Sequence, residues 1–498
     1  MNEVQYRELC KSCDQLLLLA DKNDDRISIP WLHVIRPHSQ FLSGYAEIFD
    51  SKKGAGCKRL VRNLLSALRN LGRSFIGGGK IWSSVEQLPS KCDLLIVSHL
   101  VNKSNLGNEN DFHYGTAAKE LADQGFDVTI ALITYTAISE STLTTKWQHS
   151  RVPRLIFATV LAFNNELPLY IRSIRSAFRL KLLQFSRSIE LDRSVASHAA
   201  LEATSGGSIH ALRIGEQIKV LVSRMQPSAL MITYEGHSWE RVAFSAARSV
   251  KPGICCIGYQ NASLFYLQHA VQRKLSDRYN PNIILTSGNV AQEKLRKNVE
   301  LLGTRIESLG HSNRSCLRNS ILATPRSTKK KLCCLVLPEG TVSECMLLFT
   351  FSLRCACIMP NIDFIWRLHP TMSFDILLRE NKEFQSLPRN INLSSALLHE
   401  DIACSRWALY RGSTAIVQAA VCGVQPVYLH QPKEIPIDTL YEIPALHKRV
   451  CQPIDFQNLA NEDEDTYCRD VQAVQDYCER IYTPMDVRVL ANCMQAKS

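Results

Sequence analysis

The stretch Phe364-Ile365-Trp366-Arg367-Leu368-His369-Pro370 indicates the fold class of this chain. An apolar, strand-like run ends abruptly at Arg367, and Pro370 cannot continue a ladder of backbone hydrogen bonds. Arg367 and His369 therefore follow a strand at the sheet edge where open α/β sheets bind ligands. The pattern fits an anion-binding site. It fits equally well a buried histidine that satisfies a turn.

Similar strand, loop and helix units lie on both sides of this stretch. The expected strands are 93–98, 126–133, 229–233 and 254–259 in a first series, and 283–286, 332–337, 362–367, 407–410 and 425–429 in a second. Strands that alternate with helices predict parallel sheets. We therefore expect an α/β protein with two Rossmann-like domains that face each other across a cleft, because 498 residues exceed one ordinary core.

The changes of pattern along the chain predict four parts. These are an N-terminal extension (1–90), a first Rossmann-like domain (91–280), a second Rossmann-like domain (281–450) and a C-terminal helical tail (451–498). In the extension, residues 27–35 resemble a strand.

A basic amphipathic helix is expected in the extension over residues 58–71. Its apolar stripe is Leu60, Val61, Leu64, Leu65, Leu68 and Leu71, and basic side chains surround the stripe. We expect the stripe to pack into a core. A helix that lies on a membrane surface is the alternative.

Charge and composition limit the partners and the compartment. The net charge of +11 favours a partner with negative charge, such as a nucleotide, a phosphorylated lipid carrier or an anionic membrane. Basic residues are spread along the chain, with one tight run at 329–331, and no nucleic-acid module is visible, so we expect no nucleic-acid partner. The apolar runs are too short to span a bilayer. The 18 scattered cysteines predict free thiols in a reducing compartment. We therefore expect a cytoplasmic protein, with peripheral contact at the inner membrane face as an alternative.

The loop Tyr234-Glu235-Gly236-His237 follows the expected strand 229–233. A carboxylate beside a histidine can act as a general base on a hydroxyl group, so Glu235 and His237 are the catalytic candidates. The alternative is that Glu235 caps the helix that starts near Trp239.

A second candidate loop, Arg411-Gly412-Ser413-Thr414, lies between a strand and a helix. Gly412 allows a close backbone approach, and the two hydroxyl groups lie beside helix N–H groups, which suits an anion. An ordinary serine cap is the alternative.

Further polar residues follow other expected strands. They are Glu339 and Gly340 after strand 332–337, and His99, Asp111, His113 and Tyr114 after strand 93–98.

The order acid-Gly, His-Pro and Ser-Thr resembles the GT-B glycosyltransferases that use CMP-activated acidic sugars, such as bacterial sialyltransferases and capsule Kdo transferases. The matching positions are Glu235-Gly236, His369-Pro370 and Ser413-Thr414. The longer stretches 233–240, 367–370, 410–414 and 420–428 also resemble bacterial surface-carbohydrate biosynthesis proteins. The resemblance covers about residues 90 to 450.

The resemblance implies a role for each matching residue. Glu235 would deprotonate the acceptor hydroxyl, and His369, Ser413 and Thr414 would hold the nucleotide phosphate. Tyr234 stands where the family has a first acid, so the base role of Glu235 and the stereochemical course stay open.

The two domains would then divide the two substrates. The first domain would bind a surface polysaccharide or a lipid-linked glycan through His99, Asp111, His113 and Tyr114. The second would bind the nucleotide-sugar through Glu339, Gly340, Arg367, His369, Pro370, Arg411, Gly412, Ser413 and Thr414. We expect a CMP-linked sugar rather than a UDP- or GDP-linked one, and no separate cofactor. No Asp-x-Asp motif follows a strand, so no metal ion is expected.

Three other functions fit the same pattern. They are a glycerol- or ribitol-phosphate transferase with a CDP donor, a non-catalytic GT-B-like scaffold in polysaccharide assembly, and a sugar-nucleotide 2-epimerase. The mass of the product separates the first from a glycosyltransferase, and a folded protein without any transfer activity indicates the scaffold.

Overall fold

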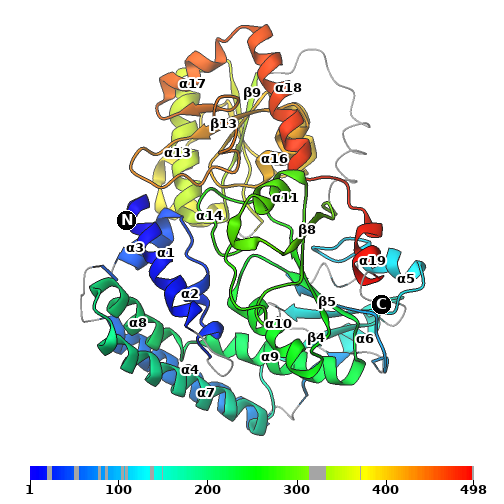
Figure 1. The fold of residues 1–498 in the computed structure, drawn as a ribbon. Helices are drawn as coiled ribbons and strands as arrows, with labels where there is room; N and C mark the ends of the chain where they lie inside the picture. The colour runs from blue at the N-terminus through cyan, green and yellow to red at the C-terminus, as the bar shows by residue number, and fades with distance from the viewer. Residues whose placement is uncertain are drawn as a thin grey trace.

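The fold was analysed in a computed structural model. The structure describes residues 1–19, 25–46, 48–49, 55–76, 80–84, 88–101, 106, 110–134, 140–147, 150–312, 332–370 and 372–495. Two α/β units lie one above the other in Figure 1, and a group of N-terminal helices lies beside them. None of the described helices has both the length and the apolar character needed to cross a membrane.

The first sheet has eight strands within the described residues, in the order β1-β4-β3-β2-β5-β6-β7-β8. All neighbours are parallel except β1 and β4. The strands are β1 (Trp82–Ser84), β2 (Leu94–Leu100), β3 (Val128–Thr134), β4 (Arg154–Phe157), β5 (Ala229–Thr233), β6 (Cys255–Gln260), β7 (Ile283–Thr286) and β8 (Arg305–Ser308). The central strands are continuous apolar runs because helices cover both faces of the sheet.

Different helices cover these two faces. On one side, α9 (Gly206–Met225) and α10 (Ser238–Val250) contribute to the core. On the other side, α5 (Ala117–Asp123) and the C-terminal α19 (Val487–Gln495) do so. Other helices of this half are α6 (Glu140–Trp147), α7 (Phe163–Leu183), α8 (Glu190–Glu202) and α11 (Asn289–Arg296).

The second sheet is fully parallel, in the order β11-β10-β9-β12-β13-β14 within the described residues. Its strands are β9 (Cys333–Leu337), β10 (Asp363–Trp366), β11 (Ile391–Leu393), β12 (Trp407–Tyr410), β13 (Gln425–Leu429) and β14 (Lys448–Val450). Its helices are α13 (Val342–Ile358), α14 (Phe374–Glu380), α15 (Leu398–Cys404), α16 (Ala415–Val421), α17 (Pro453–Ala460) and α18 (Glu464–Ile481). The expectation of two α/β units with parallel sheets is confirmed.

The N-terminal helices form a third core against the first unit. This core combines α1 (Glu3–Leu18), α2 (Pro30–His33), α3 (Ser39–Ala46) and α8 with residues 267–279, and it reaches Ile435 of the second unit. The strand expected over 27–35 is instead a 3₁₀ turn (Asp25–Ser28) followed by α2. Pro30 stands at the first turn of α2, where its fixed φ favours a helix.

Two expected boundaries differ from the strand pairing. β1 lies within the expected extension but pairs with β4 of the first sheet. β7 and β8 fall within the expected second domain, but β7 pairs with β6 and β8 pairs with β7, so both extend the first sheet. The chain therefore enters the second sheet only after residue 308.

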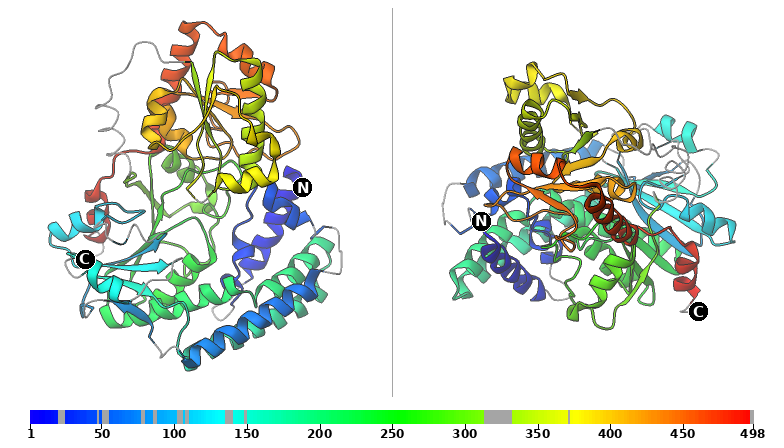
Figure 2. Two further views of the ribbon diagram at one scale, coloured as in Figure 1. Left: turned by 180° about the vertical axis from the view of Figure 1, so that it is seen from behind. Right: turned by 90° about the horizontal axis from the view of Figure 1, so that it is seen from above.

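The expected basic helix is α4 (Ala55–Ile76). The prediction that its apolar stripe packs into a core is wrong, because five of the six stripe residues are exposed and Leu71 is half-buried. The side that faces the protein is polar instead. Figure 2 shows α4 at the edge of the molecule, beside α7 and α8.

Candidate functional site

The candidate loops of both sheets lie where the strand order reverses. In the second sheet β9 lies between β10 and β12, and these strands are followed by Glu339, Arg367 and Arg411. In the first sheet the corresponding neighbours are β2 and β5, and the Tyr234–His237 loop follows β5. Open α/β sheets bind ligands in the crevice at this point. The strand order therefore supports the loops predicted from the sequence as candidate sites.

Glu235 and His237 form a pair at the end of β5. His237 Nε2 lies 3.4 Å from Glu235 Oε2, and both side chains are about one third exposed. Burial raises the pKa of Glu235, but the hydrogen bond with His237 and the charge of His237 outweigh it, so the net pKa is lowered. Burial lowers the pKa of His237, but Glu235 and Glu240 raise it above its ordinary value. The pair can therefore hold one proton between an imidazole and a carboxylate.

A different acid, Glu240, holds this loop in place. Its buried carboxylate accepts the backbone N–H groups of Glu235, Gly236 and His237 at 2.8 to 3.1 Å. Glu240 therefore caps α10, and Glu235 is left for its pair with His237. The sequence reasoning missed this residue, although a glutamate at the third position of a helix is a known capping signal.

Gly236 is required by the shape of the same loop. Its φ is +84°, and a Cβ atom here would overlap the carbonyl group of Ala270. A side chain at this position is therefore strained and also lacks space.

Tyr234, which replaces the first acid of the resembled family, lies in the core. Its ring is buried, with the Arg241 guanidinium 5.2 Å from the ring centre. Tyr234 packs instead of adding a second charge beside Glu235.

The four expected acceptor residues separate into two kinds. Asp111 accepts hydrogen bonds from Ser98 Oγ and from the backbone N–H groups of His113 and Tyr114, so it shapes the loop. The buried Tyr114 hydroxyl donates to a backbone carbonyl. His99 and His113 stack edge to face at 5.3 Å, and burial lowers the pKa of each to about 4. Both rings are therefore neutral at pH 7, although the charge of Glu235 opposes the effect of burial on each pKa.

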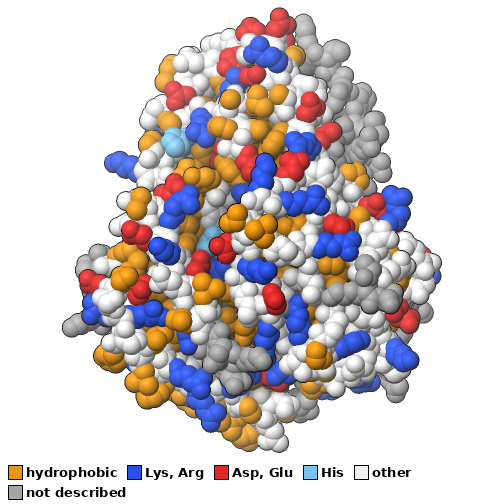
Figure 3. Space-filling model, in the orientation of Figure 1, with side chains coloured by type: hydrophobic (Ala, Val, Ile, Leu, Met, Phe, Trp, Pro, Cys, Tyr) orange, Lys and Arg blue, Asp and Glu red, His pale blue; other side chains and the backbone are white. Residues whose placement is uncertain are grey.

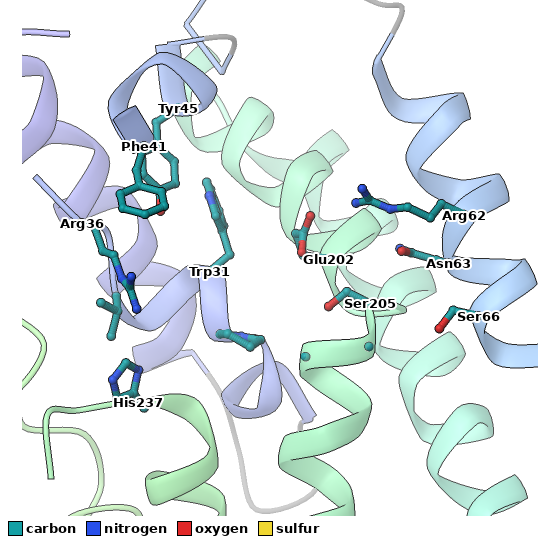
Figure 4. Close-up of a pocket in the computed structure, with 14 residues that line it drawn as sticks. Trp31, Arg36, Phe41, Tyr45, Arg62, Asn63, Ser66, Glu202, Ser205 and His237 are labelled. Carbon is teal, nitrogen blue, oxygen red and sulfur yellow. The ribbon is translucent and has the colours of Figure 1, made fainter. Parts of the chain in front are cut away.

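A cavity of about 620 Å³ opens beside His237. Figure 4 shows His237 at one end and residues of α4 at the other. The lining residues are Pro30, Trp31, Val34, Arg36, Phe41, Tyr45, Arg62, Asn63, Ser66, Glu202, Ser205, Gly206, Gly207 and His237. The wall combines three aromatic rings with two arginines and one acid, Glu202. Aromatic rings with an excess of positive charge suit a sugar or glycan with a negative charge. Most of these residues belong to the extension, where the sequence carried no motif.

The segment after α2 connects the two sheet edges. Arg36 lines the cavity, and its positive charge acts on both sheet edges. It contributes to the lowered pKa of Glu235, and it opposes the burial that raises the pKa of Glu339. His38 lies 3.5 Å from Glu339 Oε2 and 3.3 Å from Glu344 Oε1. The first-sheet pair and the second-sheet loops therefore face a common region around this segment.

In the loop after β12, the arginine side chain is engaged in ion pairs. The buried Arg411 guanidinium donates to Glu344 Oε1 at 2.6 Å and to Glu434 Oε2 at 2.5 Å. A Cβ atom at Gly412 would overlap the Glu339 carboxylate, so these two loops lie in contact. Thr414, rather than Ser413, occupies the cap position of α16, and it makes no capping hydrogen bond with its side chain.

The stretch after β10 also contains an arginine that is held by an ion pair, and it contains a histidine that is exposed. Arg367 Nη1 donates to Ala396 O at 2.7 Å and to the buried Asp401 at 2.6 Å. His369 and Pro370 are exposed, and burial lowers the pKa of His369. His369 is thus more accessible to a ligand than Arg367 is. Within the described part of the chain, no group of three His, Cys, Asp or Glu side chains is arranged to hold a metal ion.

Comparison with known proteins finds no matching family model and no matching curated protein. Among solved structures the chain is similar to the glycotransferase of kitacinnamycin, with 10% identity, a TM-score of 0.45, and coverage of 82% of this chain and 98% of that one. It is also similar to UDP-GlcNAc 2-epimerase from Neisseria meningitidis bound to UDP-GlcNAc, with 11% identity, a TM-score of 0.47, and coverage of 81% and 100%. For MurG from Acinetobacter baumannii these values are 10%, 0.43, 81% and 99%. Likenesses this distant say nothing of the substrate.

Proposed function

We propose that this chain is a glycosyltransferase that moves a sugar from a nucleotide-sugar to a glycan acceptor. One observation carries the proposal: the Glu235–His237 pair lies at the switch point of the first sheet, beside a cavity lined with aromatic and basic side chains. A carboxylate and histidine at this distance can accept a proton from a hydroxyl group. The cavity offers a place for the acceptor that carries this hydroxyl group.

The donor would lie against the loops of the second sheet. The hydroxyl groups of Ser413 and Thr414 and the exposed His369 imidazole follow β12 and β10, where a phosphate can bind. Arg411 and Arg367 are engaged with carboxylates, so we assign them to the support of these loops. Of the residues predicted for the donor site, we therefore propose His369, Ser413 and Thr414 as the ones that contact the phosphate.

The reaction then follows from the placement of the two substrates. The acceptor oxygen forms a bond to the anomeric carbon, and the bond from that carbon to the nucleotide phosphate breaks. The acceptor proton passes to the Glu235–His237 pair, and the bonding electrons leave with the nucleotide. Hydrogen-bond donors of the second sheet stabilise the negative charge on that phosphate.

The substrates are proposed at a finer level from the resemblance. The donor is a CMP-linked acidic sugar, and the acceptor is a surface polysaccharide or a lipid-linked glycan. An acceptor on a lipid would bring this protein into contact with an anionic membrane. Arg36 and Arg62 at the cavity suit an acceptor that carries negative charge.

Two measurements test the proposal. Thermal shifts with CMP, CDP, UDP and GDP identify the nucleotide, since a ligand that binds the folded state raises the melting temperature. Mass spectrometry of products from a panel of nucleotide-sugars then separates sugar transfer from phosphoryl transfer. Glu235→Gln and His237→Gln should each reduce transfer by about 10²- to 10⁴-fold, with the exposed Glu300→Gln as the matched control. Full activity in both variants would overturn the assignment of the base.

A further inference from the structure

Helix α4 presents its apolar side chains to the solvent. Leu64 is 57% exposed, Leu68 is 59% exposed and Phe75 is 69% exposed. Leu60, Val61 and Leu65 are exposed on the same helix. A helix on the surface of a globular protein ordinarily turns such a stripe toward the core.

The inward side of α4 is polar, so the helix is not held by its stripe. Asn63 Nδ2 donates to Leu201 O at 3.2 Å and to Thr204 Oγ1 at 3.3 Å. Arg59 pairs with Glu202 at 3.8 Å, and Ser74 is buried. These contacts fix the orientation of α4 and leave the apolar stripe for an external partner.

Helix α7 and the turn after it extend this surface. The exposed apolar side chains here are Ile171, Ile174, Phe178, Leu182, Phe185 and Ile189. The buried side of α7 includes the small residues Ser173 and Ser176. Phe75 at the end of α4 stacks on Phe163 at the start of α7, with ring centres 4.0 Å apart. We call the exposed apolar residues of α4, together with these six, the α4/α7 face.

The charges on these helices indicate what kind of partner the α4/α7 face binds. The α4 sequence contains five basic residues, Lys58, Arg59, Arg62, Arg69 and Arg73, and no acidic residue. On α7, Arg175, Arg179 and Lys181 are exposed, whereas Glu166 is buried and paired with Arg213. Orange and blue side chains lie along the lower edge in Figure 3, where Figure 1 places α4 and α7. An apolar face flanked by cations fits the interface of an anionic bilayer.

We propose that the α4/α7 face docks on an anionic phospholipid membrane. Its apolar side chains enter the interface between headgroups and acyl chains, and the flanking lysines and arginines contact the headgroups. Arg62, Asn63 and Ser66 of α4 also line the cavity beside His237, so the docked face places that cavity near the bilayer. The use of this contact to present a lipid-linked acceptor rests on the proposed function, but the contact itself does not.

The test is co-sedimentation of the full chain with vesicles of phosphatidylcholine alone or mixed with phosphatidylglycerol. Binding should require the anionic lipid and weaken as salt is raised. Leu64→Glu and Phe178→Glu should each weaken binding by about tenfold or more, because each removes a buried side chain from the interface. Arg69→Gln with Arg73→Gln should weaken it through charge alone. The control is Val299→Glu, which places the same charge at an exposed apolar residue on another helix.

Three results would overturn the proposal. They are absence of binding to anionic vesicles, an equal loss in Val299→Glu, and a dimer in solution that Leu64→Glu converts to monomer without any vesicle binding. The last result would mean that a second copy covers the face. The assay contains no sugar substrate, so vesicle binding without transfer contradicts only the proposed function. Transfer to a water-soluble acceptor without vesicle binding contradicts only the proposal that the α4/α7 face binds a membrane.

Discussion

The ion pairs of the Arg411 guanidinium determine whether this side chain supports the loop after β12 or is available to bind a phosphate. Its side chain and that of Glu344 are each 2% exposed, and Arg411 also pairs with Glu434. Removal of one partner from a buried ion pair costs about 3–5 kcal/mol, because the other charge stays buried. His38 lies 3.3 Å from Glu344 and retains part of this stabilisation. We therefore expect Arg411→Gln to lower the free energy of unfolding by about 3 kcal/mol, at the lower end of that range.

Urea unfolding followed by tryptophan fluorescence measures this loss, since Trp366 and Trp407 are buried in the second unit. The double variant Arg411→Gln with Glu344→Gln should recover part of the stability, because no unpaired charge then remains between these two residues. The matched control is Arg480→Gln. Arg480 pairs with Glu293, both side chains are about half exposed, and such a pair contributes about 1 kcal/mol or less.

One result would refute this reasoning. If Arg411→Gln unfolds no more easily than Arg480→Gln, the Arg411 guanidinium is not needed by the two carboxylates. It would then be available as a phosphate ligand, as the sequence predicted. Nucleotide-induced thermal shifts in the same two variants would show that directly, through a loss confined to Arg411→Gln.

Three further outcomes are expected. Transfer should rise with pH as His237 loses its proton, with a midpoint above the ordinary value of 6.5, and Glu235→Gln should move this midpoint to lower pH because it removes a cause that raises the pKa; initial rates across the pH range measure both. His369→Ala should abolish donor turnover and change the unfolding free energy by less than about 0.5 kcal/mol, as for other exposed residues, which urea unfolding and transfer assays check together. Gly236→Ala should lower the unfolding free energy by at least about 2 kcal/mol, since it adds backbone strain and an overlap with Ala270; an unchanged urea midpoint would contradict this.

Regular sequence patterns predicted the two sheets, because buried parallel strands leave a local signature. Runs such as Leu94 to Val97 are apolar on both faces, and each is followed by a polar loop. The pairing partner of a short strand leaves no such signature. Residues 283–286 could extend either sheet, and only the hydrogen bonds with β6 assign them to the first. The domain boundary predicted between residues 280 and 281 is therefore not supported by the pairing of β7 with β6.

The candidate site was predictable to the level of its loops. Glu235, His237, His369 and Ser413 follow strands at the sheet edge, as their positions in the sequence indicated. The contacts between distant segments were not predictable. His38 contacts Glu344 although more than three hundred residues separate them in the sequence. The sequence around either residue contains no pattern that predicts this contact. The same holds for the aromatic cavity wall, which comes from the extension.

The orientation of α4 cannot be predicted from the periodicity of its sequence alone. A repeat of three or four residues defines two sides of a helix, but it does not say which side meets the protein. Here Leu201 O and Thr204 supply hydrogen-bond partners for Asn63, and these partners come from a part of the chain far from α4. Because the neighbouring surface is polar, the polar side of α4 turns inward and the leucines face outward. An amphipathic stripe on a basic helix therefore identifies a core contact only when an apolar neighbour is available to receive it.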